Sequence, residues 1–152
     1  MNSKICTSIE QSKILIELGI DVNTADMRYG YIAPYDYSDR MYDGGYDEVP
    51  YPKDFLKKNP NFSENEYDGE LPAWSLSALL QLMPKSICIK QSEHSGYFYF
   101  LEWQFANDNS LRYVGIDSKC LIDIYSDHDV ALKDDIDTAF EMVCWLKENK
   151  KI

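Results

Sequence analysis

The sequence has little positive charge. Its 152 residues contain 15 Lys and Arg against 26 Asp and Glu, which gives a formal net charge of −11 at pH 7. Proteins that grip nucleic acid neutralise phosphates with an excess of Lys and Arg, and docking on an anionic membrane needs the same excess. The charge therefore argues against direct nucleic-acid binding and against membrane binding, and it favours a protein partner with a basic surface.

Catalytic and metal-binding motifs are equally scarce. The chain has two histidines, His94 and His128, and no C-x-x-C pair, G-x-S-x-G elbow, H-E-x-x-H or Gly-rich phosphate loop. Acids beside each histidine can raise its pKa, but on a loop this pattern is more typical of a solvated charge cluster. We therefore expect no catalytic residue, no metal and no cofactor.

The sequence also lacks targeting and membrane segments. Residues 1–6 contain no apolar signal core, and no run approaches the about 18 apolar residues that span a bilayer. Four cysteines, far apart in the sequence, each have apolar neighbours: Cys6, Cys88, Cys120 and Cys144. Buried, reduced thiols have this setting, so we predict a cytoplasmic protein.

Residues 8–18 have the pattern of a helix. The segment Thr7-Ser8-Ile9-Glu10 has the S/T-x-x-E spacing of a capping box, in which two free backbone N–H groups are satisfied reciprocally. Gly19 suits the left-handed C′ position that ends a helix, and Ile20 suits the hydrophobic contact that follows.

Residues 75–83 form a second predicted helix, which is short and buried. Ser75 can cap its start, and Pro84 disfavours helical geometry at the residue before it. The residues between them are apolar almost all round, with only Ser77 and Gln81 suited to water. We expect Leu79 and Leu80 to be nearly inaccessible.

A third helix, amphipathic, is predicted over residues 134–149. Acids lie near its start and lysines near its end, which complements the helix dipole. Its apolar face is expected to contain Ile136, Ala139, Phe140, Val143 and Cys144.

Strands are predicted mainly between the second and third helices. Aromatic and β-branched residues over 85–90, 97–105, 111–116 and 121–125, separated by turn formers, indicate an antiparallel meander. Residues 27–33 alternate weakly and are compatible with another strand, whereas Pro50 and Pro52 are expected to break any strand.

These elements predict an α+β fold. Residues 1–152 are expected to form one globular domain, an antiparallel sheet of about three to five strands covered by the N-terminal, central and C-terminal helices. A long irregular segment rich in Tyr and Asp interrupts the domain at about 29–70. So long a loop is uncommon in a compact domain and is usually functional or mobile.

That segment is the best candidate for a binding site. Between Tyr29 and Tyr51 it contains seven tyrosines interleaved with acids. Aromatic clusters are typical of recognition surfaces, and acids speed encounter with a basic partner. The predicted binding residues are Tyr35, Asp36, Tyr37, Asp39, Tyr42, Asp43, Tyr46 and Asp47. The alternative is that the tyrosines cover the sheet and the acids only keep the loop soluble.

Three other functions remain open from the sequence. An acidic protein can imitate DNA phosphates and inhibit a nucleic-acid-binding host protein. A hydrolase can use two carboxylates that meet in space. Calcium or magnesium can bind clustered acids, here Asp123, Asp127, Asp129, Asp134 and Asp135 with His128, although the spacing does not match the known calcium-loop motif.

Two segments also resemble a known group of proteins. They are Pro72-Ala73-Trp74-Ser75-Leu76-Ser77-Ala78-Leu79-Leu80, followed by Met83-Pro84, and the segment over residues 139–149 that begins Ala139-Phe140-Glu141. They are similar to segments of small uncharacterised proteins of gut bacteria and of their phages or mobile elements. The resemblance implies a genomic setting and no chemistry. With the composition, it predicts a non-enzymatic accessory protein that binds another macromolecule.

Overall fold

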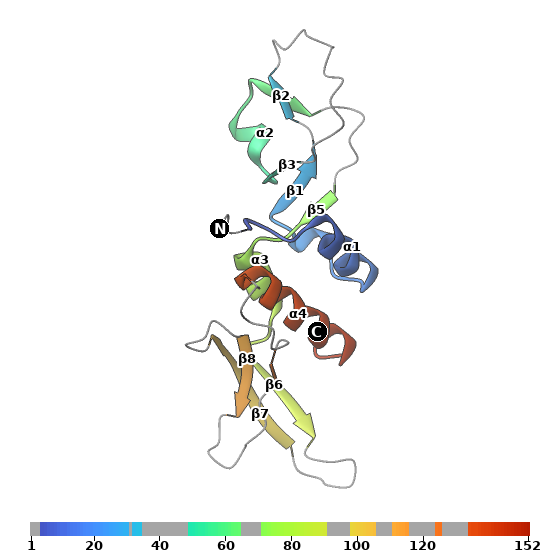
Figure 1. Cartoon of the computed structure of the whole chain (residues 1–152), viewed down its shortest axis with the longest axis vertical. Coiled ribbons are helices and arrows are strands. Elements are labelled where there is room, and N and C mark those ends of the chain that lie inside the picture. The colour runs from blue at the N-terminus through green and yellow to red at the C-terminus, as the bar shows by residue number, and fades with distance from the viewer. Residues whose placement is uncertain are drawn as a thin grey trace. The chain divides into compact units, whose positions relative to one another are not determined.

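The computed structural model describes residues 4–30, 32–34, 49–64, 71–90, 98–105, 111–115, 124–125 and 134–152 (Figure 1). The chain divides into two compact units, one of Ile5–Ala78 and one of Met1–Lys4 with Leu79–Ile152. Both units contain helices and strands, and the described strand pairs are all antiparallel. The predicted α+β class is confirmed. The prediction that the chain is a single domain stays a prediction.

The first unit begins with α1, Ile9–Glu17, which confirms the N-terminal helix. Its capping box lies one residue later than predicted: Ser8 Oγ accepts the Gln11 N–H, and Gln11 Oε1 accepts the Ser8 N–H. The predicted box at Thr7 and Glu10 is wrong because the Thr7 hydroxyl is used elsewhere, in a buried contact with Trp74.

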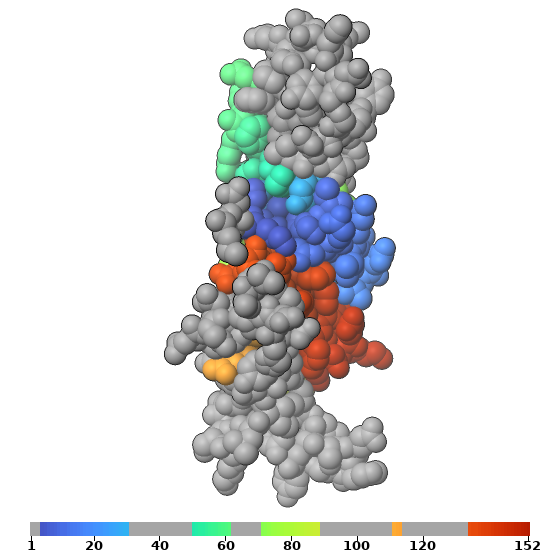
Figure 2. Space-filling model, in the orientation of Figure 1, coloured from blue at the N-terminus to red at the C-terminus, as the bar shows by residue number. Residues whose placement is uncertain are grey.

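The C-terminal end of α1 matches the prediction. Gly19 has a φ of 80°, and its N–H donates to Ile16 while the Ile20 N–H donates to Leu15. These two bonds define a Schellman motif, and Ile20 is buried beside it. The helix and the following turn form part of the surface shown in Figure 2 (blue). Ile14 and Val22, in α1 and just after it, are each 42% exposed.

A three-stranded sheet follows, in the order β3-β1-β5. After a short 3₁₀ turn, η1 (Val22–Thr24), the strands are β1 (Met27–Gly30), β3 (Val49–Pro52) and β5 (Leu71–Ala73). A single helical turn, α2 (Phe55–Lys58), follows β3 in the sequence. A second, two-stranded sheet pairs β2 (Ile32–Pro34) with β4 (Phe62–Glu64), so the weak strand predicted over 27–33 is two strands.

The expectation that Pro50 and Pro52 break any strand is wrong, and the register explains why. They pair with Tyr29 and Met27, and the next pair along is hydrogen-bonded, since Lys53 N–H donates to Asp26 O. Pairs alternate along an antiparallel ladder, so both prolines occupy positions whose backbone groups point away from β1. A proline costs no ladder bond there, because β3 is an edge strand.

The core of the first unit lies where α1 contacts β5. Leu15 on the helix and Ala73 and Trp74 at the end of the strand are fully buried. The Trp74 indole N–H donates to Thr24 Oγ1, so even the polar atom of this side chain is satisfied.

The central helix is α3, Leu76–Leu82, which contains the boundary between the units. Ser75 caps it as predicted, since its Oγ accepts the Ala78 N–H, and the Asp26 carboxylate accepts both the backbone N–H and the hydroxyl of Ser75. Leu79 is fully buried, which confirms the prediction, whereas Leu80 is only partly buried.

The predicted meander forms the sheet of the second unit, in the order β6-β7-β8-β9. Its strands are β6 (Ser86–Lys90), β7 (Phe98–Phe105), β8 (Leu111–Gly115) and β9 (Ile124–Tyr125). Leu111 and Tyr113 are fully buried, and the Tyr113 hydroxyl donates to Pro84 O.

Helix α4, Asp135–Glu148, contacts β8. Asp134 and Asp137 form a capping box at its start, and Lys4 reaches both carboxylates, through its backbone N–H and its ammonium respectively. The buried face is rotated slightly from the predicted one: Phe140 and Cys144 are half-buried, and Met142 and Leu146 are fully buried instead.

Candidate functional site

All eight predicted binding residues, from Tyr35 to Asp47, lie outside the described residues. His94, His128 and the acids at 123, 127 and 129 lie outside them as well. These assignments stay predictions. Of the remaining acids of the suggested cation cluster, Asp134 is used in the capping box and Asp135 is exposed.

The two ends of the Tyr-rich segment are described, and there the tyrosines are packing residues. The Tyr29 hydroxyl donates to Thr7 O at 2.8 Å, and Tyr51 is only 4% exposed. The Tyr51 ring meets Phe55 edge-on, with the ring centres 6.1 Å apart, and the Arg28 guanidinium lies 5.0 Å from the Tyr51 ring centre. Tyr29 and Tyr51 therefore have packing roles in the first unit.

These contacts give the segment a firmly packed base. Gly30 is the last residue of β1, and Val49 is the first residue of β3. The two residues are paired, so the chain leaves β1 and enters β3 at the same position of the sheet. A Cβ on Gly30 would lie 3.0 Å from the Tyr51 hydroxyl oxygen, so a larger residue there would make the Tyr51 side chain shift by a few tenths of an ångström. The Tyr51 ring thus packs against Gly30 at the base of the segment.

Beneath the base lies a buried polar cluster centred on Thr7. Its Oγ1 accepts the Trp74 N–H at 3.0 Å and shares a hydrogen bond of 2.8 Å with Ser12 Oγ. Its backbone N–H donates to Trp74 O. Neither hydroxyl has a histidine or carboxylate as its partner in these bonds, so this geometry does not activate either as a nucleophile. The cluster is structural.

Two of the described thiols, Cys6 and Cys144, are also poor nucleophiles. Cys6, Cys88 and Cys144 are free cysteines. Burial raises the pKa of Cys6, and burial with the nearby Glu148 and Glu141 raises the pKa of Cys144 to about 11. A thiol reacts as the thiolate, so these two cysteines are held in their unreactive form at neutral pH.

We therefore expect Cys144 to resist alkylation. Near neutral pH its thiolate population is about a hundredfold below that of an ordinary cysteine, since its pKa is about 11. Iodoacetamide labelling followed by mass spectrometry of the tryptic peptides measures this, with a free cysteine-containing peptide in the same tube as the control. Labelling of Cys144 at the rate of the control peptide would contradict the inferred burial.

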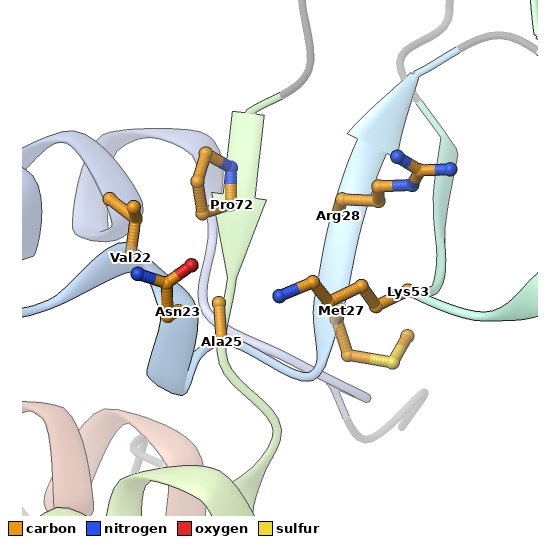
Figure 3. Close-up of a pocket in the computed structure, with 7 residues that line it drawn as sticks. All are labelled: Val22, Asn23, Ala25, Met27, Arg28, Lys53 and Pro72. Carbon is orange, nitrogen blue, oxygen red and sulfur yellow. The ribbon is translucent and has the colours of Figure 1, made fainter.

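A surface pocket of about 220 Å³ lies in the first unit, between η1, β1, β5 and the residue after β3 (Figure 3). The residues that line it are Val22, Asn23, Ala25, Met27, Arg28, Lys53 and Pro72. None of them was singled out as a site residue from the sequence. They come from three separate parts of the chain, so no local spacing marks them as a group.

The lining contains two cations and no acid. A carboxylate-based hydrolase needs paired acids in a pocket, and this pocket does not supply them. Among the residues that the structure describes, no group of three or more His, Cys, Asp or Glu is placed to hold a metal ion. Over the same residues, no helix has the length and apolar character that crossing a membrane requires.

Comparison with known proteins identifies no relative of this chain. No protein-family model, no curated protein and no solved structure matches the chain.

Proposed function

We propose that the chain is a non-enzymatic accessory protein of a phage or mobile element that binds a protein with a basic surface through residues 35–47. The observation that carries this proposal is the packed base of the segment: Gly30 pairs with Val49, and the Tyr51 ring packs on Gly30. Binding segments are commonly loops that a rigid scaffold positions.

Composition supplies the recognition chemistry of the segment. With Tyr29 and Tyr51 used in packing, five tyrosines remain, and of these Tyr35, Tyr37, Tyr42 and Tyr46 are the proposed contact residues. Tyrosine offers a large contact area and fixes few rotors on binding. The interleaved Asp36, Asp39, Asp43 and Asp47 would steer a basic partner toward them in a chain that already has a net charge of −11.

The cell compartment belongs to the same proposal. Cys6, Cys88 and Cys144 are free, as expected of a protein that works in the reducing cytoplasm, where disulfides are rare. A phage or mobile-element protein acting inside its bacterial host would meet its partner there.

The test is replacement of Tyr35, Tyr37, Tyr42 and Tyr46 by Ser. The tagged wild-type protein and the variant are used to capture proteins from host lysate, with quantitative mass spectrometry of both eluates. We expect the principal captured protein to be lost with the variant, while the melting temperature stays within about 2 °C of the wild type because none of the four residues belongs to the packed base.

Two further variants sharpen the result. Ser77→Ala with Gln81→Ala changes exposed residues of α3 and should leave capture intact. Replacing Asp36, Asp39, Asp43 and Asp47 by Asn should slow association with the captured protein and flatten its salt dependence, with a smaller effect on dissociation. Capture that survives the four Tyr→Ser changes shows that residues 35–47 are not the binding site.

A further inference from the structure

The pocket beside β1 has a chemistry that residues 35–47 do not share. It combines cations with apolar side chains in a chain that is otherwise strongly acidic. At about 220 Å³ it is smaller than the about 300–1,000 Å³ of a typical drug-sized site. Any ligand it takes is small.

Lys53 supplies a positive charge inside the pocket. Its side chain runs from the end of β3 across the pocket, and its ammonium ends between β1 and the side formed by Pro72 and Asn23 (Figure 3). Among the described residues no carboxylate pairs with it, unlike Lys58, which pairs with Asp54 at 2.7 Å. Arg28 also lines the pocket, from β1, but its guanidinium carbon lies 5.0 Å from the Tyr51 ring centre, so Lys53 is the cation on which the proposal rests.

Asn23 supplies an oriented hydrogen-bond acceptor. Its Nδ2 donates to Asp21 Oδ1 at 2.9 Å, and the same oxygen accepts the Asn23 backbone N–H. With Nδ2 held by Asp21, the amide oxygen is turned toward the pocket, as Figure 3 shows. A ligand N–H can donate to that oxygen.

The rest of the lining is apolar. Val22, Ala25, Met27 and Pro72 form the wall between these polar groups, and Val22 is 42% exposed. An inorganic anion would leave this apolar surface wet, whereas an organic anion with an aliphatic group would cover it.

We propose that this pocket binds a small carboxylate that carries an aliphatic group and an N–H donor, the pattern of an N-acylated aliphatic amino acid. The carboxylate pairs with the Lys53 ammonium, the N–H donates to Asn23 Oδ1, and the aliphatic group packs on Val22 and Pro72. The site is independent of the partner proposed for residues 35–47, so either proposal can fail without the other.

The experiment titrates the full chain with N-acetyl-leucine and follows backbone amides by ¹H–¹⁵N NMR. We expect saturable shifts centred on the pocket residues. N-acetyl-leucinamide lacks the carboxylate, hexanoate lacks the N–H and inorganic phosphate lacks both the N–H and the aliphatic group, so each should bind at least about tenfold more weakly.

Lys53→Gln keeps most of the side chain and removes the charge, so it should weaken N-acetyl-leucine binding about tenfold or more. Lys57→Gln is the matched control: it makes the same charge change on exposed α2, outside the pocket, and should leave binding unchanged. Unperturbed pocket amides, equal binding of the amide or of phosphate, or an unchanged affinity in Lys53→Gln would each overturn the proposal.

Discussion

Thr7→Val is expected to lower the free energy of unfolding by about 2–4 kcal/mol. Valine has nearly the shape of threonine, so packing changes little. It cannot accept the Trp74 N–H or bond to Ser12 Oγ, and all three residues are fully buried. A buried donor or acceptor left without a partner costs about 1–3 kcal/mol. Urea denaturation followed by circular dichroism measures the change.

Two further variants distinguish the contribution of the Thr7 hydroxyl to stability from that of the neighbouring groups. Thr7→Ser keeps the hydroxyl and loses one buried methyl group, so it should cost about 1 kcal/mol. Adding Ser12→Ala to Thr7→Val should cost less than the sum of the two single changes, because the Ser12 hydroxyl that lost its partner is then gone. A Thr7→Val protein as stable as the wild type would show that the cluster contributes nothing to stability.

Leu79→Ala is expected to destabilise the protein by about 2–5 kcal/mol. The Leu79 side chain is fully buried in α3, and its truncation removes apolar contact and leaves a cavity. Alanine is a better helix former than leucine, so the loss is one of packing rather than of helix propensity. Thermal and urea unfolding of the variant both measure it.

Neighbouring residues of α3 provide the controls. Leu80→Ala makes the same chemical change at a half-buried position, so it should cost clearly less than Leu79→Ala. Gln81→Ala, at an exposed position, should change stability by about 0.5 kcal/mol or less. Equal effects at Leu79 and Leu80 would contradict the burial difference between them.

The sequence patterns correctly predicted the elements whose structure depends mainly on their own residues. Helices α1, α3 and α4 and the meander from β6 to β9 lie where sequence patterns placed them. The errors occur where a contact with a residue distant in the sequence determines the local structure. Thr7 and Ser8 are both able to cap a helix, and Ser8 does so because Thr7 is bound to Trp74, which is 67 residues away.

The three-stranded sheet shows the same limit. Pro50 and Pro52 look like strand breakers until the pairing partner of β3 is known, because only the register tells which side of the strand their nitrogens face. The pocket was not predicted for a related reason: Asn23, Lys53 and Pro72 come from three separate parts of the chain, and no spacing in the sequence connects them.

The register of β3 also limits how another chain can bind to the first unit. On the outer side of this edge, the residues whose backbone points away from β1 are Pro50 and Pro52, so that side offers carbonyl oxygens and no N–H groups. An added strand needs donors and acceptors in alternation, and it cannot obtain them there. A partner strand could only donate its own N–H groups to the Pro50 and Pro52 carbonyls and would receive no hydrogen bond in return, so the joining of copies of the chain through this edge into a continuous sheet is disfavoured.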